Sequence, residues 1–315
     1  REVKEAIRLL ENIPVEQQRL IYQGQTLEDD AVLKDRNIES GALLHLVLRL
    51  AKPIIYLYPP TEQRVTTRLS LSPEWEFSAI YPVVEPKSTK DGQLLEWVVD
   101  ANPNGLLKEV GTGLEVSYLY WEAEYVIPSP PFCSSTHLYF RSIPTPLISP
   151  PPSPQTTPLT LEASHLPQPS TLFSPNQPLL TPSNSVFLTQ AKLPGYLDAS
   201  LKALGLHTEA RTSFITFWLP SFLKHKYIAL RFVHQQSYER AARLDITPRP
   251  DVVVRIFMLF RGVKEHEADK WDEAKVRAGE DPRMWIDVVG VREAVRNVCD
   301  TAMFRVLEWG GLEVL

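Results

Sequence analysis

The sequence has little cysteine and no long apolar run, and each shortage excludes a class of protein. Cys133 and Cys299 are the two cysteines in 315 residues, too few for a disulfide framework or a four-ligand zinc site, which fits a reducing compartment. No stretch approaches the twenty apolar residues that a membrane-spanning helix needs. The net charge of −5 is unsuited to binding a phosphate backbone. We therefore expect a cytoplasmic or nuclear chain that binds neither membrane nor nucleic acid.

Several signatures of catalysis and cofactor binding are also missing. Gly310 and Gly311 follow an expected strand, but the lysine and the spacing of a P-loop are absent. The sequence contains no Gly-x-Ser-x-Gly elbow and no His-x-x-x-His metal pair. Cys299 is expected at a buried helix position, where a cysteine is usually inert. We predict no metal and no cofactor, and nothing indicates the oligomeric state.

Charge is nearly absent from residues 127–190, while proline is abundant there. This segment carries Arg141 and Glu162 as its charges, and 15 of the 28 prolines fall between Pro128 and Pro182. Such a composition favours an extended, disordered insert over helix or sheet. Its Pro-x-x-Pro stretches permit docking to SH3 or WW-type domains, but such patterns arise readily in any proline-rich tract, so the composition favours a plain linker or a translated intron.

The first fifty residues have a compact α/β pattern. Val3, Ala6, Ile7 and Leu10 follow the spacing of one face of an amphipathic helix. An alternating strand is expected at residues 19–22 and a longer one at residues 43–50.

These fifty residues resemble ubiquitin almost without gaps. The resemblance is long and collinear, and its motifs are Asn12-Ile13-Pro14, Gln17-Gln18-Arg19-Leu20-Ile21-Tyr22, Gly24, Leu27-Glu28-Asp29, Asn37-Ile38 and residues 44–50. It implies a partial ubiquitin-like β-grasp over residues 1–51. The family's opening β-hairpin has no counterpart, so we expect the natural protein to extend upstream of Arg1.

The end of this segment departs from the family. Conjugated relatives end in a flexible tail with a Gly-Gly terminus, whereas here Leu50-Ala51-Lys52-Pro53 continues into more chain. We therefore expect a permanent fusion, not a modifier that is attached to other proteins.

The outer face of the ubiquitin-like sheet is the strongest candidate site. Ile21, His45 and Val47 alternate away from the expected core, and Arg19 and Arg49 flank them. In ubiquitin the matching positions form the surface on which most receptors dock. An apolar patch rimmed by cations suits protein binding. The resemblance implies ubiquitin-binding proteins or the proteasome as partners. The alternative is that these residues pack against the rest of the chain.

Residues 52–126 and 191–315 resemble a family of microbial and fungal proteins for which we know no established activity. The shared motifs are Lys52-Pro53-Ile54-Ile55-Tyr56-Leu57-Tyr58-Pro59, Tyr118-Leu119-Tyr120-Trp121-Glu122, Trp218-Leu219-Pro220, Ile246-Thr247-Pro248-Arg249-Pro250-Asp251 and Glu308-Trp309-Gly310-Gly311. We expect one mixed, β-rich α+β domain that the proline-rich insert interrupts.

Two carboxylates of this second region are candidate catalytic residues. Glu122 and Glu308 each follow or precede a tryptophan, and an aromatic wall can raise the pKa of a carboxyl so that it acts as an acid. Two such groups could hydrolyse a glycoside. The alternative is structural, with the carboxylates pairing to Arg249 or Arg255. The sequence therefore leaves a hydrolase of a glycan or another polar substrate as the second hypothesis, behind the interaction protein.

Overall fold

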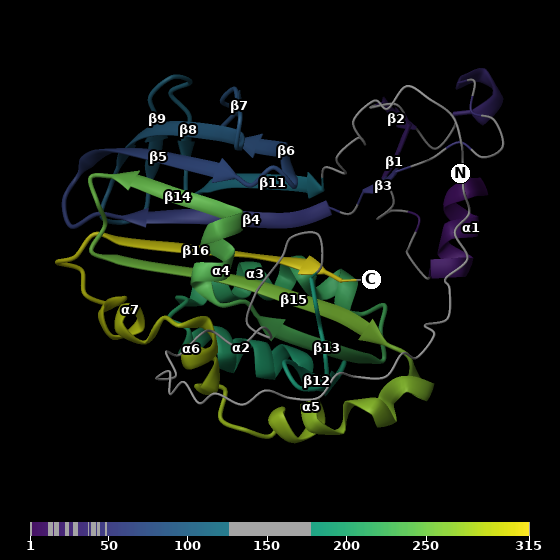
Figure 1. Ribbon diagram of the computed structural model, residues 1–315. Helices are drawn as coiled ribbons and strands as arrows, with labels where there is room; N and C mark the ends of the chain where they lie inside the picture. The colour runs from purple at the N-terminus through teal and green to yellow at the C-terminus, as the bar shows by residue number, and fades with distance from the viewer. Residues whose placement is uncertain are drawn as a thin grey trace, which may run out of the picture.

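The computed structural model describes residues 2–11, 15, 19–22, 25–27, 31–36, 38, 42, 45–47, 49–125 and 178–314. Side chains are described for most of these residues; at 8–11, 19, 21, 25, 26, 45–47, 49–52 and 125 the backbone alone is described. The expected insert at 127–190 lies outside the described residues except for 178–190. The molecule is a mixed α+β protein (Figure 1).

The N-terminal part combines one helix with a small antiparallel sheet of strand order β2-β1-β3. Its elements are α1 (Glu2–Glu11), β1 (Arg19–Tyr22), β2 (Gln25–Leu27), the short 3-10 helix η2 (Leu33–Arg36) and β3 (His45–Val47). The helix differs from the expected pattern, because Val3 and Ile7 are half-buried and Ala6 is exposed, whereas Lys4 is buried.

A seven-stranded sheet forms the centre of the rest of the molecule. Its order is β12-β13-β15-β16-β4-β11-β6, with β15 and β16 parallel and the other neighbours antiparallel. The strands are β4 (Arg49–Tyr58), β6 (Trp75–Tyr81), β11 (Leu119–Tyr125), β12 (Val186–Thr189), β13 (Tyr227–Phe232), β15 (Val252–Val263) and β16 (Arg305–Glu313). Strands from both sides of the insert thus share one sheet, in which β16 pairs with β4.

A second sheet packs on one face of the first (Figure 1). Its strands are β5 (Gln63–Leu71), β7 (Lys87–Thr89), β8 (Gly92–Ala101), β9 (Leu107–Glu109), β10 (Glu115–Val116) and β14 (Ala242–Thr247). Helix α4 (Gln235–Ala241) leads into β14, and the 3-10 helix η4 (Glu265–Trp271) and α5 (Asp272–Arg277) cover the β12 end of the same face.

Helices cover the opposite face of the seven-stranded sheet, so the region has three layers. They are α2 (Leu193–Ala203), α3 (Thr208–Phe222), α6 (Met284–Val289) and α7 (Arg292–Asn297). Strand β4 shows how alternation builds two cores: Ile55 and Leu57 pack between the sheets, while Ile54 and Tyr56 pack towards the helices. No helix among the described residues is both long enough and apolar enough to cross a bilayer.

Two details of the expected secondary structure are corrected. The many charges of residues 264–278 predict a solvated helix, but Trp271 and Ala274 point into the core between the layers. Cys299 is exposed and follows the end of α7, so its expected burial is wrong. By contrast, the apolar residues of 252–260 predict a strand buried on both faces, and β15 has this burial.

Candidate functional site

The backbone register of the small sheet gathers four of the expected docking positions. Arg19 lies opposite Val47, and Ile21 lies opposite His45. Directly opposed residues share one face of an antiparallel pair, and residues two apart on a strand share it as well. These four positions, which we call the β1–β3 face, therefore lie together.

The other face of the same sheet is the buried one. Leu20 pairs with Leu46 on β3 and with Leu27 on β2. Leu20 is 3% exposed and Leu27 is 6% exposed. Burial on this side leaves the β1–β3 face as the side turned away from the local core.

Arg49 does not belong to this sheet. It begins β4, where it pairs with Glu124 of β11, and the next two residues pair with both neighbours of β4: Leu50 with Ala123 and Ala51 with Gly311. The segment that corresponds to the tail of a conjugated relative is therefore a strand of the seven-stranded sheet.

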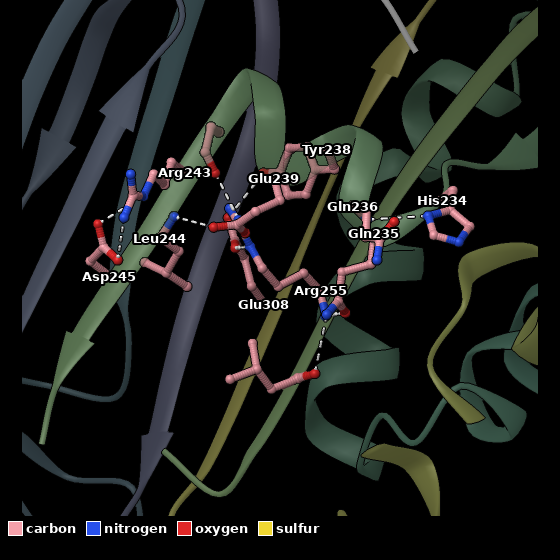
Figure 2. A network of polar contacts seen from close by, with 12 residues as sticks. His234, Gln235, Gln236, Tyr238, Glu239, Arg243, Leu244, Asp245, Arg255 and Glu308 are labelled. Carbon is pink, nitrogen blue, oxygen red and sulfur yellow. Dashed lines mark hydrogen bonds and ion pairs between the residues drawn. The ribbon is translucent and has the colours of Figure 1, made fainter. Parts of the chain in front are cut away.

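Glu308, the first carboxylate candidate, lies in a buried polar network between the two sheets (Figure 2). Its side chain is fully buried and forms an ion pair with the equally buried Arg255. Tyr238 donates its hydroxyl hydrogen to Glu308 at 2.9 Å, and the indole of Trp121 donates at 3.3 Å. Arg255, Tyr238 and Trp121 thus compensate the charge of one buried carboxylate. Glu308 therefore has a structural role and not the catalytic one.

Arg255 is held from several further directions. It forms a second ion pair with Glu239 and donates to the carbonyl of Ala242 at 2.7 Å. Its guanidinium lies 4.5 Å from the ring centre of Tyr238. Burial alone would lower the pKa of Arg255, but Glu308, Tyr238 and Glu239 together outweigh it, so the net shift of this pKa is upward. Burial also raises the pKa of Tyr238 well above its ordinary value. The network joins α4, β14, β15 and β16.

Glu122 lies on the other face of the seven-stranded sheet. On β11, Trp121 packs between the sheets with Glu308, while the neighbouring Tyr120 packs towards the helices. Alternation puts the half-buried Glu122 on the same side as Tyr120. The structure therefore does not bring the two carboxylates together, and the expected two-carboxylate site does not form from this pair.

The sequence reasoning missed an aromatic and polar cluster on that helix side. His207 of the α3 start is hydrogen-bonded to the hydroxyl of Tyr58 at 2.7 Å, and Nδ1 of His207 accepts from the backbone N–H of Ala210. Tyr56 contacts both Tyr58 and His207. Burial lowers the pKa of His207 and raises the pKa of Tyr58 to about 12. A histidine directly before a helix start was the available signal.

Since Nδ1 of His207 accepts, the neutral ring carries its hydrogen on Nε2 and donates to Tyr58. The arrangement caps a helix and fixes a tyrosine. Among the described residues, no group of three His, Cys, Asp or Glu side chains is arranged to hold a metal.

Comparison with known proteins concerns the N-terminal part. Residues 1–51 match the model of the Ubiquitin family. The NEDD8-like protein RUB3 of Arabidopsis thaliana is 48% identical over 48 residues, which are 15% of this chain and 62% of that protein. Ubiquitin-like protein 1 of Schizosaccharomyces pombe is 46% identical over 48 residues, with the same shares of the two chains. The ubiquitin domain-containing protein DSK2 of Saccharomyces cerevisiae is 46% identical over 50 residues, 16% of this chain and 13% of that protein.

The chain thus spans about 62% of the length of the NEDD8-like and ubiquitin-like relatives. No solved structure matched the chain. With the register of β1 to β3, these matches identify the N-terminal segment as a ubiquitin-like domain.

Proposed function

We propose that this protein is an interaction protein whose ubiquitin-like segment is not conjugated and docks onto ubiquitin-binding proteins or the proteasome, in the cytoplasm or nucleus. The observation that carries the proposal is the register that groups Arg19, Ile21, His45 and Val47 on the β1–β3 face, opposite the buried Leu20. Apolar side chains rimmed by cations give affinity through burial and orientation through charge.

The course of β4 supports a permanent fusion. Covalent attachment needs a free, flexible terminus after the last strand, whereas Leu50 and Ala51 are hydrogen-bonded within a sheet and no Gly pair follows. The match to DSK2, of which it covers 13%, is likewise a ubiquitin-like segment within a longer chain.

We further propose that 52–126 and 191–315 form one domain, interrupted by 127–190. Strand pairing across the insert supports it, since β4 pairs with β16 in one sheet and β5 pairs with β14 in the other. The hydrolase hypothesis loses its basis in this pair of carboxylates, because Glu308 is committed to Arg255.

The test of docking compares two aliphatic substitutions. Ile21→Ala removes apolar surface from the β1–β3 face, and Val32→Ala does so at a site that is 57% exposed and outside the sheet. We expect Ile21→Ala to weaken binding to purified proteasomes or ubiquitin receptors about tenfold, as for a central interface residue, and Val32→Ala to bind like the parent chain. Equal binding by both variants would contradict docking through this face.

A further inference from the structure

Arg231 of β13 is a buried cation with apolar neighbours. Its side chain is 7% exposed. Ala229 of the same strand and Val233, just past its end, lie two residues to either side, and across the ladder Arg231 pairs with Leu259 of β15. Each of these three neighbours is at most 1% exposed. Most of Arg231 is therefore withdrawn from water, and these three side chains offer it no hydrogen bonds.

No counter-charge accompanies Arg231 within the part of the chain that the structure describes. Its side chain forms no ion pair with a described carboxylate, and its Nε is buried without a hydrogen-bond partner. Burial lowers the pKa of Arg231. Arg255, on the same face of the neighbouring strand, provides the contrast, because Glu308 and Glu239 neutralise it.

An unpaired buried guanidinium is unfavourable, and it cannot escape by losing its proton. A folded protein therefore keeps such a group where an anion reaches it, or where it serves as the binding group for one. The planar fork of arginine suits the two oxygens of a carboxylate or a phosphate.

The position of Arg231 at the end of β12 suits an incoming ligand. The β12–β13 ladder begins with the pair Val186–Leu230, so Arg231 lies one residue beyond it, where β13 has no further pairing to β12. The chain before β12 has no acidic residue from 178 to 185. A second arginine, Arg277 of α5, reaches the same segment and donates to the carbonyls of Pro182 and Ser185.

We propose that Arg231 binds the anionic group, a carboxylate or a phosphate, of a small ligand taken from solution at this end of β12. This site is separate from the β1–β3 face, and its failure would leave the proposed docking function untouched.

The experiment measures thermal unfolding of the full chain in inorganic phosphate, in acetate and in chloride of equal ionic strength. Three variants accompany the parent chain: Arg231→Met, which keeps the length of the side chain without its charge; Arg296→Met, which makes the same change at an exposed arginine; and Glu162→Gln, which removes the one acid between residues 127 and 190.

We expect phosphate or acetate to raise the Tm of the parent chain, of Arg296→Met and of Glu162→Gln by several degrees over chloride. Arg231→Met should lack this rise and should be at least as stable as the parent chain in chloride, because an unpaired buried charge has been removed. General salt effects on stability act on all four chains and cancel in the comparison.

Three results would overturn the proposal. The first is a parent chain that responds to neither anion beyond chloride. The second is an Arg231→Met variant that keeps the response. The third is a fall in the Tm of both Arg231→Met and Glu162→Gln in chloride, since the chain itself would then supply the counter-charge.

Discussion

The ubiquitin-like region and the rest of this molecule differ in how many hydrophobic side chains they bury. Among the described residues before position 48, the buried hydrophobic side chains are Val15, Leu20 and Leu27. The region from Arg49 onwards fills two extensive cores, one between its sheets and one under its helices. The N-terminal region matches a known family, yet the second region contains nearly all of the core.

Family resemblance and core size are thus independent properties. A ubiquitin-like segment is recognised by the order of its motifs, and its outer face is specified by strand register. The second region fully buries four tryptophans in its sheets, Trp75, Trp97, Trp121 and Trp309, and the buried ionic network around Arg255 and Glu308 serves packing. Evidence about function is therefore concentrated where the smaller share of the folding energy lies.

The largest effect should come from breaking the buried ion pair of the second region. Glu308→Leu leaves Arg255 charged, buried and deprived of its main partner. We expect a loss of about 3–5 kcal/mol in the free energy of unfolding, the usual cost of an uncompensated buried charge. Urea unfolding of the full chain, followed by tryptophan fluorescence, measures this change.

The double variant Arg255→Met with Glu308→Leu is the control for that loss. Removal of both charges should recover most of the stability, because replacing a whole buried pair by apolar groups is often neutral. A double variant as unstable as Glu308→Leu would mean that side-chain packing, and not charge compensation, accounts for the stability lost at this site. If Glu308→Leu were as stable as the parent chain, the buried ion pair would not contribute to the stability of the second region.

A smaller, pH-dependent effect is expected from two histidine caps. His207 and His234 precede α3 and α4, and each accepts a backbone N–H through Nδ1. Burial lowers the pKa of both rings from their ordinary value of 6.5. Since the folded state binds these protons more weakly than the unfolded state, their contribution is complete above pH 6.5 and is lost as the pH falls through the lowered values.

Replacement of both histidines by asparagine tests these caps. Asparagine caps helices well but does not titrate, so the double variant should lose less stability than the parent chain between pH 7.5 and pH 5. We expect the difference to approach about 1 kcal/mol per cap. Urea midpoints across this range give the answer. Parallel pH profiles for the two proteins would rule out protonation of the caps as a source of acid sensitivity.

Features that depend on local sequence could be predicted, whereas features that depend on contacts between distant elements could not. The buried strand β15 was predictable, because its apolar run is local and Arg255 alone breaks it between Val252 and Phe260. The β1–β3 face was predictable in part from alternation, but Arg49 was not, since its place in β4 depends on pairing with Glu124 far along the chain. For Glu308 the structural alternative is the one that forms, since it pairs with Arg255. Its further partner Tyr238 was not predictable, because Tyr238 lies on another element, α4.

The smallest effect is expected from removing the ubiquitin-like segment altogether. Neither core of the second region contains a described residue before Pro53, and β4 itself begins at Arg49. A chain that starts at Arg49 should therefore keep the Tm of its main unfolding transition within about 2 °C, which corresponds to less than about 1 kcal/mol for a domain of this size. Differential scanning calorimetry of the two chains compares their transitions directly. A drop of many degrees would mean that the first 48 residues pack into the second region, and the β1–β3 face would then be a candidate for that contact instead of a surface for another protein.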